Sequence, residues 1–157
     1  MVVYRIERIK YLKTTLTGIG ASMSNGFRWN SFNTKIIYTA DSRALATLEV
    51  SVHLDINEDL PTDRYYVEIE IPKEITIHEV KVEDLPENWN SNPPTLITQT
   101  IGDDFVFQNE SAVFKVPSSI VLQEFNYLIN PNHPDAKKMK VIGKTPMNFD
   151  QRLKMKK

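Results

Sequence analysis

The sequence predicts an α+β fold with a mixed or mostly antiparallel sheet. Two observations lead to this class: strand patterns outnumber helix patterns, and the two kinds do not alternate regularly along the chain. Regular alternation would have indicated a doubly wound fold. The length of 157 residues favours one domain over 1–157, long enough to bury a core without metal or disulfides.

The first expected elements are a strand and a helix. Residues 34–40 are β-branched and aromatic, which favours a strand. Asp41 or Ser42 can then cap a helix. Its core stripe, at helical spacing, consists of Leu45, Leu48 and Val52.

The second half of the chain has mainly strand patterns. Residues 65–72 alternate between apolar and polar, and 74–82 alternate and then slip phase, as a bulge or turn would require. Pro94 can open a short helix that Gly102 ends. Two more strands are expected, over 112–116 and 139–142.

Composition and net charge argue against several classes of function. The net charge of −1 provides no strong field for a phosphate backbone, so a direct nucleic-acid partner is not expected, and the basic tail 152–157 is interpreted as solvated. The absence of cysteine excludes thiol nucleophiles and thiolate metal sites. Charged residues near the N-terminus and the lack of a long apolar run predict a soluble, cytoplasmic protein without a membrane segment.

The densest cluster of unusual residues lies between Gly20 and Glu49. Glycine-rich backbone allows close approach to a ligand, and Arg28 offers a donor fork suited to phosphate. Trp29 could supply a flat face, although a surface arginine beside a core tryptophan explains the pattern equally simply. Tyr38 is either a sheet residue or a stacking platform at a cleft.

Glu49 borders the buried stripe of its helix, about 40° from Leu45. An inward carboxylate is uncommon unless it is paired or functional. Two interpretations stay open: a structural pair with Arg28, or stabilisation of a developing cation on a sugar. His53 follows one turn later, but one Glu/His pair has too few ligands, so no metal site is expected.

Polar residues also gather after the strand at 112–116. Ser118 and Ser119 stand at its end, where they either face a ligand or cap the next turn, and no nucleophile elbow surrounds them. Asn126 and Asn130 are interpreted as amides that hold a turn. His133, between asparagine and proline residues, is also expected in a structured turn.

Taken in order, several segments resemble the RES domain over almost the whole chain. They are 18–21, 26–30, 37–40, 45–49, 85–86 with Trp89, 116–119, 124–134 and 149–153. The resemblance implies a fold similar to ADP-ribosyltransferases and a toxin that degrades NAD by cleaving the nicotinamide–ribose bond, as a glycohydrolase or phosphorylase. It also implies an Xre-like antitoxin as the partner. NAD would be the substrate, with no further cofactor.

The resemblance also assigns the candidate residues. Arg28, Tyr38 and Glu49 match the catalytic set, and the expected substrate contacts are Arg28, Tyr38, Trp29, Ser118, Ser119 and Asn126. Phe27 and Asn33 depart from the family pattern, which favours glycine at both places.

Two alternatives remain: ADP-ribosyl transfer to a protein target, and an inactive module that only binds an antitoxin. Retention of the catalytic set argues against the inactive module. The acceptor is open, and so is the oligomeric state, a homodimer included.

Overall fold

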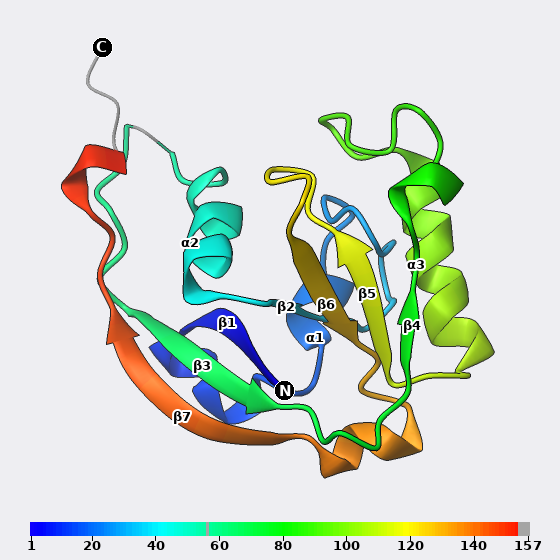
Figure 1. Ribbon diagram of the computed structural model, residues 1–157. Coiled ribbons are helices and arrows are strands. Elements are labelled where there is room, and N and C mark those ends of the chain that lie inside the picture. The colour runs from blue at the N-terminus through cyan, green and yellow to red at the C-terminus, as the bar shows by residue number, and fades with distance from the viewer. Residues whose placement is uncertain (56, 154–157) are drawn as a thin grey trace.

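A computed structural model describes residues 1–55 and 57–153, which form a seven-stranded sheet with helices (Figure 1). The strands are β1 (Val2–Arg8), β2 (Ile37–Ala40), β3 (Arg64–Glu70), β4 (Ile77–Glu79), β5 (Val113–Pro117), β6 (Phe125–Ile129) and β7 (Lys140–Met147). Their order is β4-β5-β6-β2-β1-β3-β7; β4 and β5 run parallel and the other neighbours antiparallel. The predicted α+β class with a mixed sheet is therefore confirmed.

Helices connect and cover these strands. The α-helices are α1 (Ile19–Ser22), α2 (Arg43–Ser51) and α3 (Leu96–Gln108). Short 3-10 helices are η1 (Ile9–Thr14), η2 (Val82–Asp84), η3 (Pro134–Lys138) and η4 (Gln151–Leu153). The basic tail begins in η4, and its residues 154–157 lie outside the described part of the chain. No helix in the described residues is long and apolar enough to cross a membrane.

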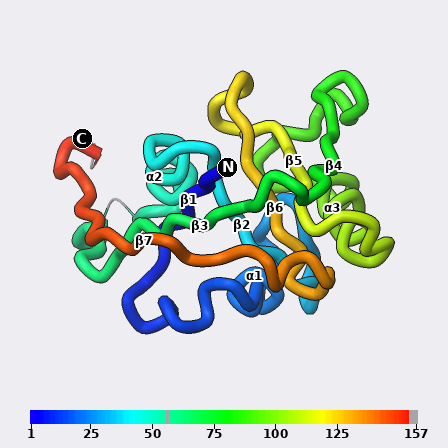
Figure 2. Tube along the Cα trace, turned by 60° about the horizontal axis from the view of Figure 1, so that its bottom comes forward, coloured from blue at the N-terminus to red at the C-terminus, as the bar shows by residue number. Residues whose placement is uncertain are grey.

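The sheet narrows at the junction of β1 and β2. These strands share the register pair Tyr4↔Ala40, whereas β1 pairs with β3 along its whole length. Helix α2 follows β2 directly and packs Leu45 and Ala46 over this junction. Helix α3 lies at the other end of the sheet, beyond β6 and β5, as Figures 1 and 2 show. The junction therefore places the last turn of α2 near the ends of β5 and β6.

An aromatic core fills the space between α3 and the sheet. Its buried members are Trp29, Ile36, Leu85, Trp89, Phe105, Phe114, Val116 and Leu128. The rings of Trp29 and Phe114 meet edge to face with centroids 6.2 Å apart, a favourable aromatic geometry. Trp29 thus ties an irregular segment, residues 23–36, to the centre of the protein.

The first expected helix is correct except at its end. Ser42 is the N-cap, accepting a hydrogen bond of 3.0 Å from the Leu45 backbone N–H. Leu45 is buried, but the helix ends at Ser51 and Val52 is 56% exposed. Placing Val52 in the core stripe was therefore wrong, because the helical spacing stops one residue before it.

The second expected helix is longer than predicted. Thr95 caps α3, which passes through Gly102 and ends at Asn109 in the left-handed conformation, φ 54°. A Cβ on Gly102 would lie 1.7 Å from the Trp29 carbonyl oxygen. Gly102 is thus a packing residue within the helix and not its stop signal.

The strand predictions are right in place and less exact in length. β2 and β4 are shorter than 34–40 and 74–82, and Val82 starts a 3-10 helix, which explains the slip in phase. β7 extends well past 142. β1 and β6 were not predicted, and Asn126 lies within β6 instead of in a turn. Asn130 and His133 do hold turns, as expected.

Candidate active site

Glu49 is the centre of a polar cluster at the end of α2. Its Oε1 accepts a hydrogen bond of 2.9 Å from the Ser118 hydroxyl and one of 2.6 Å from the Asn126 amide. Ser118 lies at the end of β5 and Asn126 in β6, so three elements meet here. Both donors are uncharged, and no ion pair to Glu49 is found among the described residues.

The second carboxylate oxygen of Glu49 faces solvent. Oε2 has no hydrogen-bond partner among the described residues, and every buried side-chain polar atom described has one. Oε2 is therefore not buried. One oxygen fixes the carboxylate in place while the other is available to an incoming ligand.

Ser118 has a second role as a turn cap. It is fully buried, and its Oγ accepts hydrogen bonds from the backbone N–H groups of Ile120 and Val121 at 3.1 and 3.0 Å. Because Oγ accepts from the backbone, its proton points to Glu49. The capping interpretation of Ser118 is thus confirmed, and the same side chain contacts Glu49. Ser119 is half-buried and makes no comparable contact among the described residues.

Arg28 projects from the irregular segment between α1 and β2. Its Nη1 donates to the carbonyl oxygens of Trp89 at 2.6 Å and Ser91 at 3.0 Å. Nε and Nη2 have no partner among the described residues and are not buried. One edge of the guanidinium is thus anchored and another is open, as a phosphate-binding fork requires.

The charge of Arg28 is linked to Glu49. Partial burial lowers the pKa of the Arg28 guanidinium, and the nearby negative charge of Glu49 acts against that shift. No ion pair joins the two side chains among the described residues, so the purely structural pair is not formed. The two side chains are near enough for the charge of one to act on the other.

Tyr38 anchors the arginine segment from β2. Its hydroxyl donates to Asn30 Oδ1 at 2.7 Å and accepts from the Trp29 N–H at 3.1 Å. Burial raises the pKa of the Tyr38 phenol, so it remains protonated. The Phe27 ring stacks on the Tyr38 ring with centroids 5.1 Å apart. The hydroxyl of Tyr38 is therefore structural, and one face of its ring is covered.

Helix α3 holds the same segment from the other side. Gln99 donates to the carbonyl oxygens of Asn25 at 2.7 Å and Phe27 at 2.9 Å. One turn later, Asp103 accepts from the backbone N–H and the hydroxyl of Ser31 at 3.0 and 2.5 Å. Sequence reasoning missed both residues. Gln99 and Asp103 are four residues apart and therefore lie on one face of a helix, with Gly102 between them in sequence. This polar pair was the signal in the sequence that could have identified them.

Three other residues singled out in the sequence are Trp29, Asn126 and Asn33, and the structure shows the surroundings or conformation of each. Trp29 is 3% exposed in the aromatic core, which corrects the expectation that its ring offers a face to substrate. Asn126 contacts Glu49, so it belongs to the polar cluster. Asn33 has φ 71°, a left-handed conformation that glycine adopts more easily.

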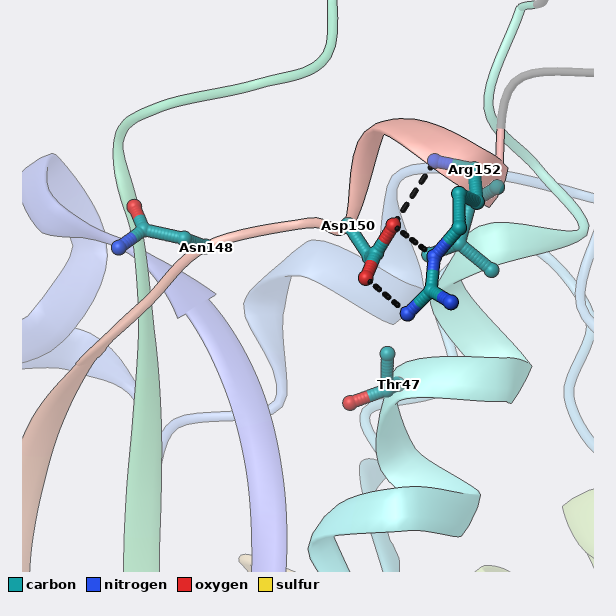
Figure 3. Close-up of a pocket in the computed structure, with 5 residues that line it drawn as sticks. Thr47, Asn148, Asp150 and Arg152 are labelled. Carbon is teal, nitrogen blue, oxygen red and sulfur yellow. Dashed lines mark hydrogen bonds and ion pairs between the residues drawn. The ribbon is translucent and has the colours of Figure 1, made fainter.

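A surface pocket of about 460 Å³ lies away from this cluster (Figure 3). It is lined by Thr47, Asn148, Asp150, Arg152 and Leu153. Thr47 lies about 200° around α2 from Glu49, on the opposite side of the helix. Asp150 and Arg152 pair with each other there, which satisfies both charges. The described residues contain no group of three or more His, Cys, Asp or Glu that could hold a metal ion.

The geometry agrees with comparisons to known proteins. The family model described as "RES domain" matches residues 2–150. The "Prs ADP-ribosylating toxin" of Sphingobium sp. (strain YBL2) is 41% identical over 145 residues, covering 91% of this chain and 89% of that protein. A "Toxin Res" of Photorhabdus laumondii is 35% identical and covers 98% of this chain and 97% of its own length.

A solved structure shares the fold. The crystal structure of the M. tuberculosis MbcT–MbcA toxin–antitoxin complex contains a chain that matches with a TM-score of 0.74 at 15% identity, covering 93% of this chain and 83% of that one. At this identity the likeness concerns the fold alone.

Proposed function

The chain belongs to the RES domain family, and from that premise we propose that it is the toxin of a toxin–antitoxin pair that cleaves the nicotinamide–ribose bond of NAD. One observation is the main support for this proposal. A carboxylate fixed through one oxygen exposes its other oxygen near an arginine whose free edge suits a phosphate.

The reaction needs a negative charge beside the ribose of NAD. When the bond between ribose C1′ and the nicotinamide nitrogen breaks, its electron pair leaves with nicotinamide, which becomes neutral. Positive charge then develops on the ribose, and the Glu49 carboxylate offsets it. Water or phosphate attacks C1′ and, in the case of water, releases a proton to solvent. The products are nicotinamide and either ADP-ribose or its 1-phosphate.

The remaining residues would bind and orient. The free Nε and Nη2 atoms of Arg28 would hold the pyrophosphate and fix the ribose before Glu49. Ser118 and Asn126 keep the carboxylate in position. The chemistry requires no metal, and NAD is a substrate and not a resident cofactor. Such an enzyme would act in the cytoplasm, as the sequence predicts.

A second candidate is transfer of ADP-ribose to a protein side chain. The name of the Sphingobium relative, "Prs ADP-ribosylating toxin", favours it. The same bond breaks in both reactions, so the roles of Glu49 and Arg28 are unchanged. Only the attacking group differs.

Product analysis tests the proposal and separates the candidates. Purified protein is incubated with NAD, with and without phosphate, and the products are resolved. We expect ADP-ribose or its 1-phosphate in amounts well above that of the enzyme. Glu49→Gln keeps the shape and removes the charge, so turnover should fall about a hundredfold or more. Glu110→Gln, on an exposed glutamate remote from the site, is the matched control.

Two other outcomes of these experiments would argue against NAD hydrolysis or phosphorolysis by Glu49. NAD that stays intact until a cell extract is added, with label then appearing on a protein, would favour transfer to a target. Near-normal turnover by Glu49→Gln would refute the assigned role of the carboxylate.

The partner is proposed on similar grounds. The structural neighbour was solved as a toxin–antitoxin complex, which supports an antitoxin for this chain, and we propose an Xre-like one. Expression of the chain alone should stop growth, and co-expression with the antitoxin should restore it. Folded Arg28→Ala and Glu49→Ala variants should be harmless. If they remain equally toxic, NAD cleavage is not the cause.

A further inference from the structure

Phe27 is the exposed aromatic residue next to Arg28. It is 37% exposed. One face of its ring stacks on Tyr38 with an interplanar angle of 29°. The rest of the ring is accessible to solvent, on the residue that directly precedes the arginine proposed to hold the pyrophosphate.

Tyr38 is only partly exposed. One side of its ring packs against the aromatic core, and Phe27 covers the other side. Its hydroxyl is used by Asn30 and the Trp29 backbone. Phe27 is the more exposed of the two stacked rings, so it offers a flat ligand the larger accessible surface.

The backbone that carries Phe27 is held on both sides. Gln99 donates to the Phe27 carbonyl oxygen at 2.9 Å, and Arg28 is anchored to Trp89 and Ser91. Tyr38 supports the ring from below. Phe27 is thus presented in a fixed orientation, which lowers the entropy lost when a ligand binds.

We propose that Phe27 is the platform on which the nicotinamide ring of NAD stacks. This rests on the proposed function. The ring is a cationic pyridinium in NAD and is attracted to an aromatic face, whereas released nicotinamide is neutral and loses that attraction. Phe27 would therefore favour substrate over product. Stacking contacts persist in the transition state, in which the nicotinamide ring is still in place, so the platform stabilises substrate and transition state to a similar extent and acts on KM more than on kcat.

This reasoning predicts a split in the kinetic constants. Phe27→Ala should raise KM for NAD about tenfold and leave kcat within about twofold of the wild type. Phe27→Tyr should keep KM near normal, because it retains the ring. Phe107→Ala removes the same ring from an exposed position on α3, 93% exposed, and is the matched control. Thermal unfolding of each variant shows whether the fold is intact.

A spectroscopic test does not depend on turnover. Phe27→Trp places a fluorescent ring on the platform, and titration with NAD should quench it more strongly than titration of the wild type, whose two tryptophans are buried. ADP-ribose, which lacks nicotinamide, should quench it much less.

The failures are distinguishable. If the wild type does not cleave NAD but NAD quenches Phe27→Trp much more than ADP-ribose does, the proposed function is refuted and the proposed stacking on Phe27 is supported. If Phe27→Ala leaves KM unchanged or lowers it, or if ADP-ribose quenches as strongly as NAD, the platform is refuted while NAD cleavage stands.

Discussion

Replacing Gly102 with alanine tests how strictly α3 positions the arginine segment. The new Cβ would lie 1.7 Å from the Trp29 carbonyl oxygen and 2.6 Å from its carbonyl carbon. Real Cβ atoms essentially never approach closer than 3.0 Å, so the backbone at Trp29 must retreat by more than about 1 Å. The neighbouring atoms are backbone, so no side-chain rotation can relieve the contact.

Arg28 directly precedes Trp29, so the retreat displaces the guanidinium. A misplacement of about 1 Å at a binding group can lower a rate about a hundredfold. The substitution also raises helix propensity by about 1 kcal/mol, so α3 itself should not weaken. We therefore expect kcat/KM for NAD to fall by about a hundredfold in a protein that still folds. Its melting temperature should drop because the core is overpacked.

The control is Gly20→Ala. It is the same substitution in the helix α1, and a Cβ there meets nothing within 4 Å. Activity is measured as nicotinamide release, and folding by circular dichroism and thermal unfolding. If Gly102→Ala folds and retains more than half of the wild-type kcat/KM, the idea that α3 sets the position of Arg28 is wrong.

Three further substitutions test the other contacts. Tyr38→Phe leaves the Trp29 N–H and Asn30 Oδ1 without their partner, so the free energy of unfolding should fall by about 1–3 kcal/mol in denaturant titration; an unchanged value would contradict an anchoring role. Ser118→Ala should lower both stability and kcat and Ser119→Ala neither, and equal effects would refute the assignment to Ser118. Arg28→Lys keeps the charge but loses the fork, so steady-state kinetics should show a raised KM with a smaller change in kcat; an unchanged KM would argue against phosphate binding.

The sequence allowed the fold class to be predicted because alternation and helical spacing are local signals. The strand at 65–72 and the cap at Ser42 follow from such patterns and were confirmed. β1 was missed since charged residues interrupt it: Arg5 and Glu7 pair with each other on one face. The length of α3 was missed because glycine is a common stop signal, and only the contact with Trp29 shows why one lies inside a helix.

The candidate site was less accessible to sequence reasoning. Glu49, Ser118 and Asn126 are separated by tens of residues, and only the pairing of β5 with β6 and the packing of α2 bring them together. Patterns also could not separate Ser118 from Ser119. That choice depends on which hydroxyl the turn after β5 buries.

The two halves of the candidate site are held in place in different ways. Glu49 is held by two strands and a helix, so its position follows from the sheet. Arg28 and Phe27 lie in a segment without regular structure, which depends on Tyr38, Gln99, Gly102 and Asp103 for its shape. A change in that segment can therefore alter which substrate is bound without disturbing the carboxylate. A bulky residue such as Phe27 can therefore be accommodated in this segment while the hydrogen bonds around Glu49 remain complete.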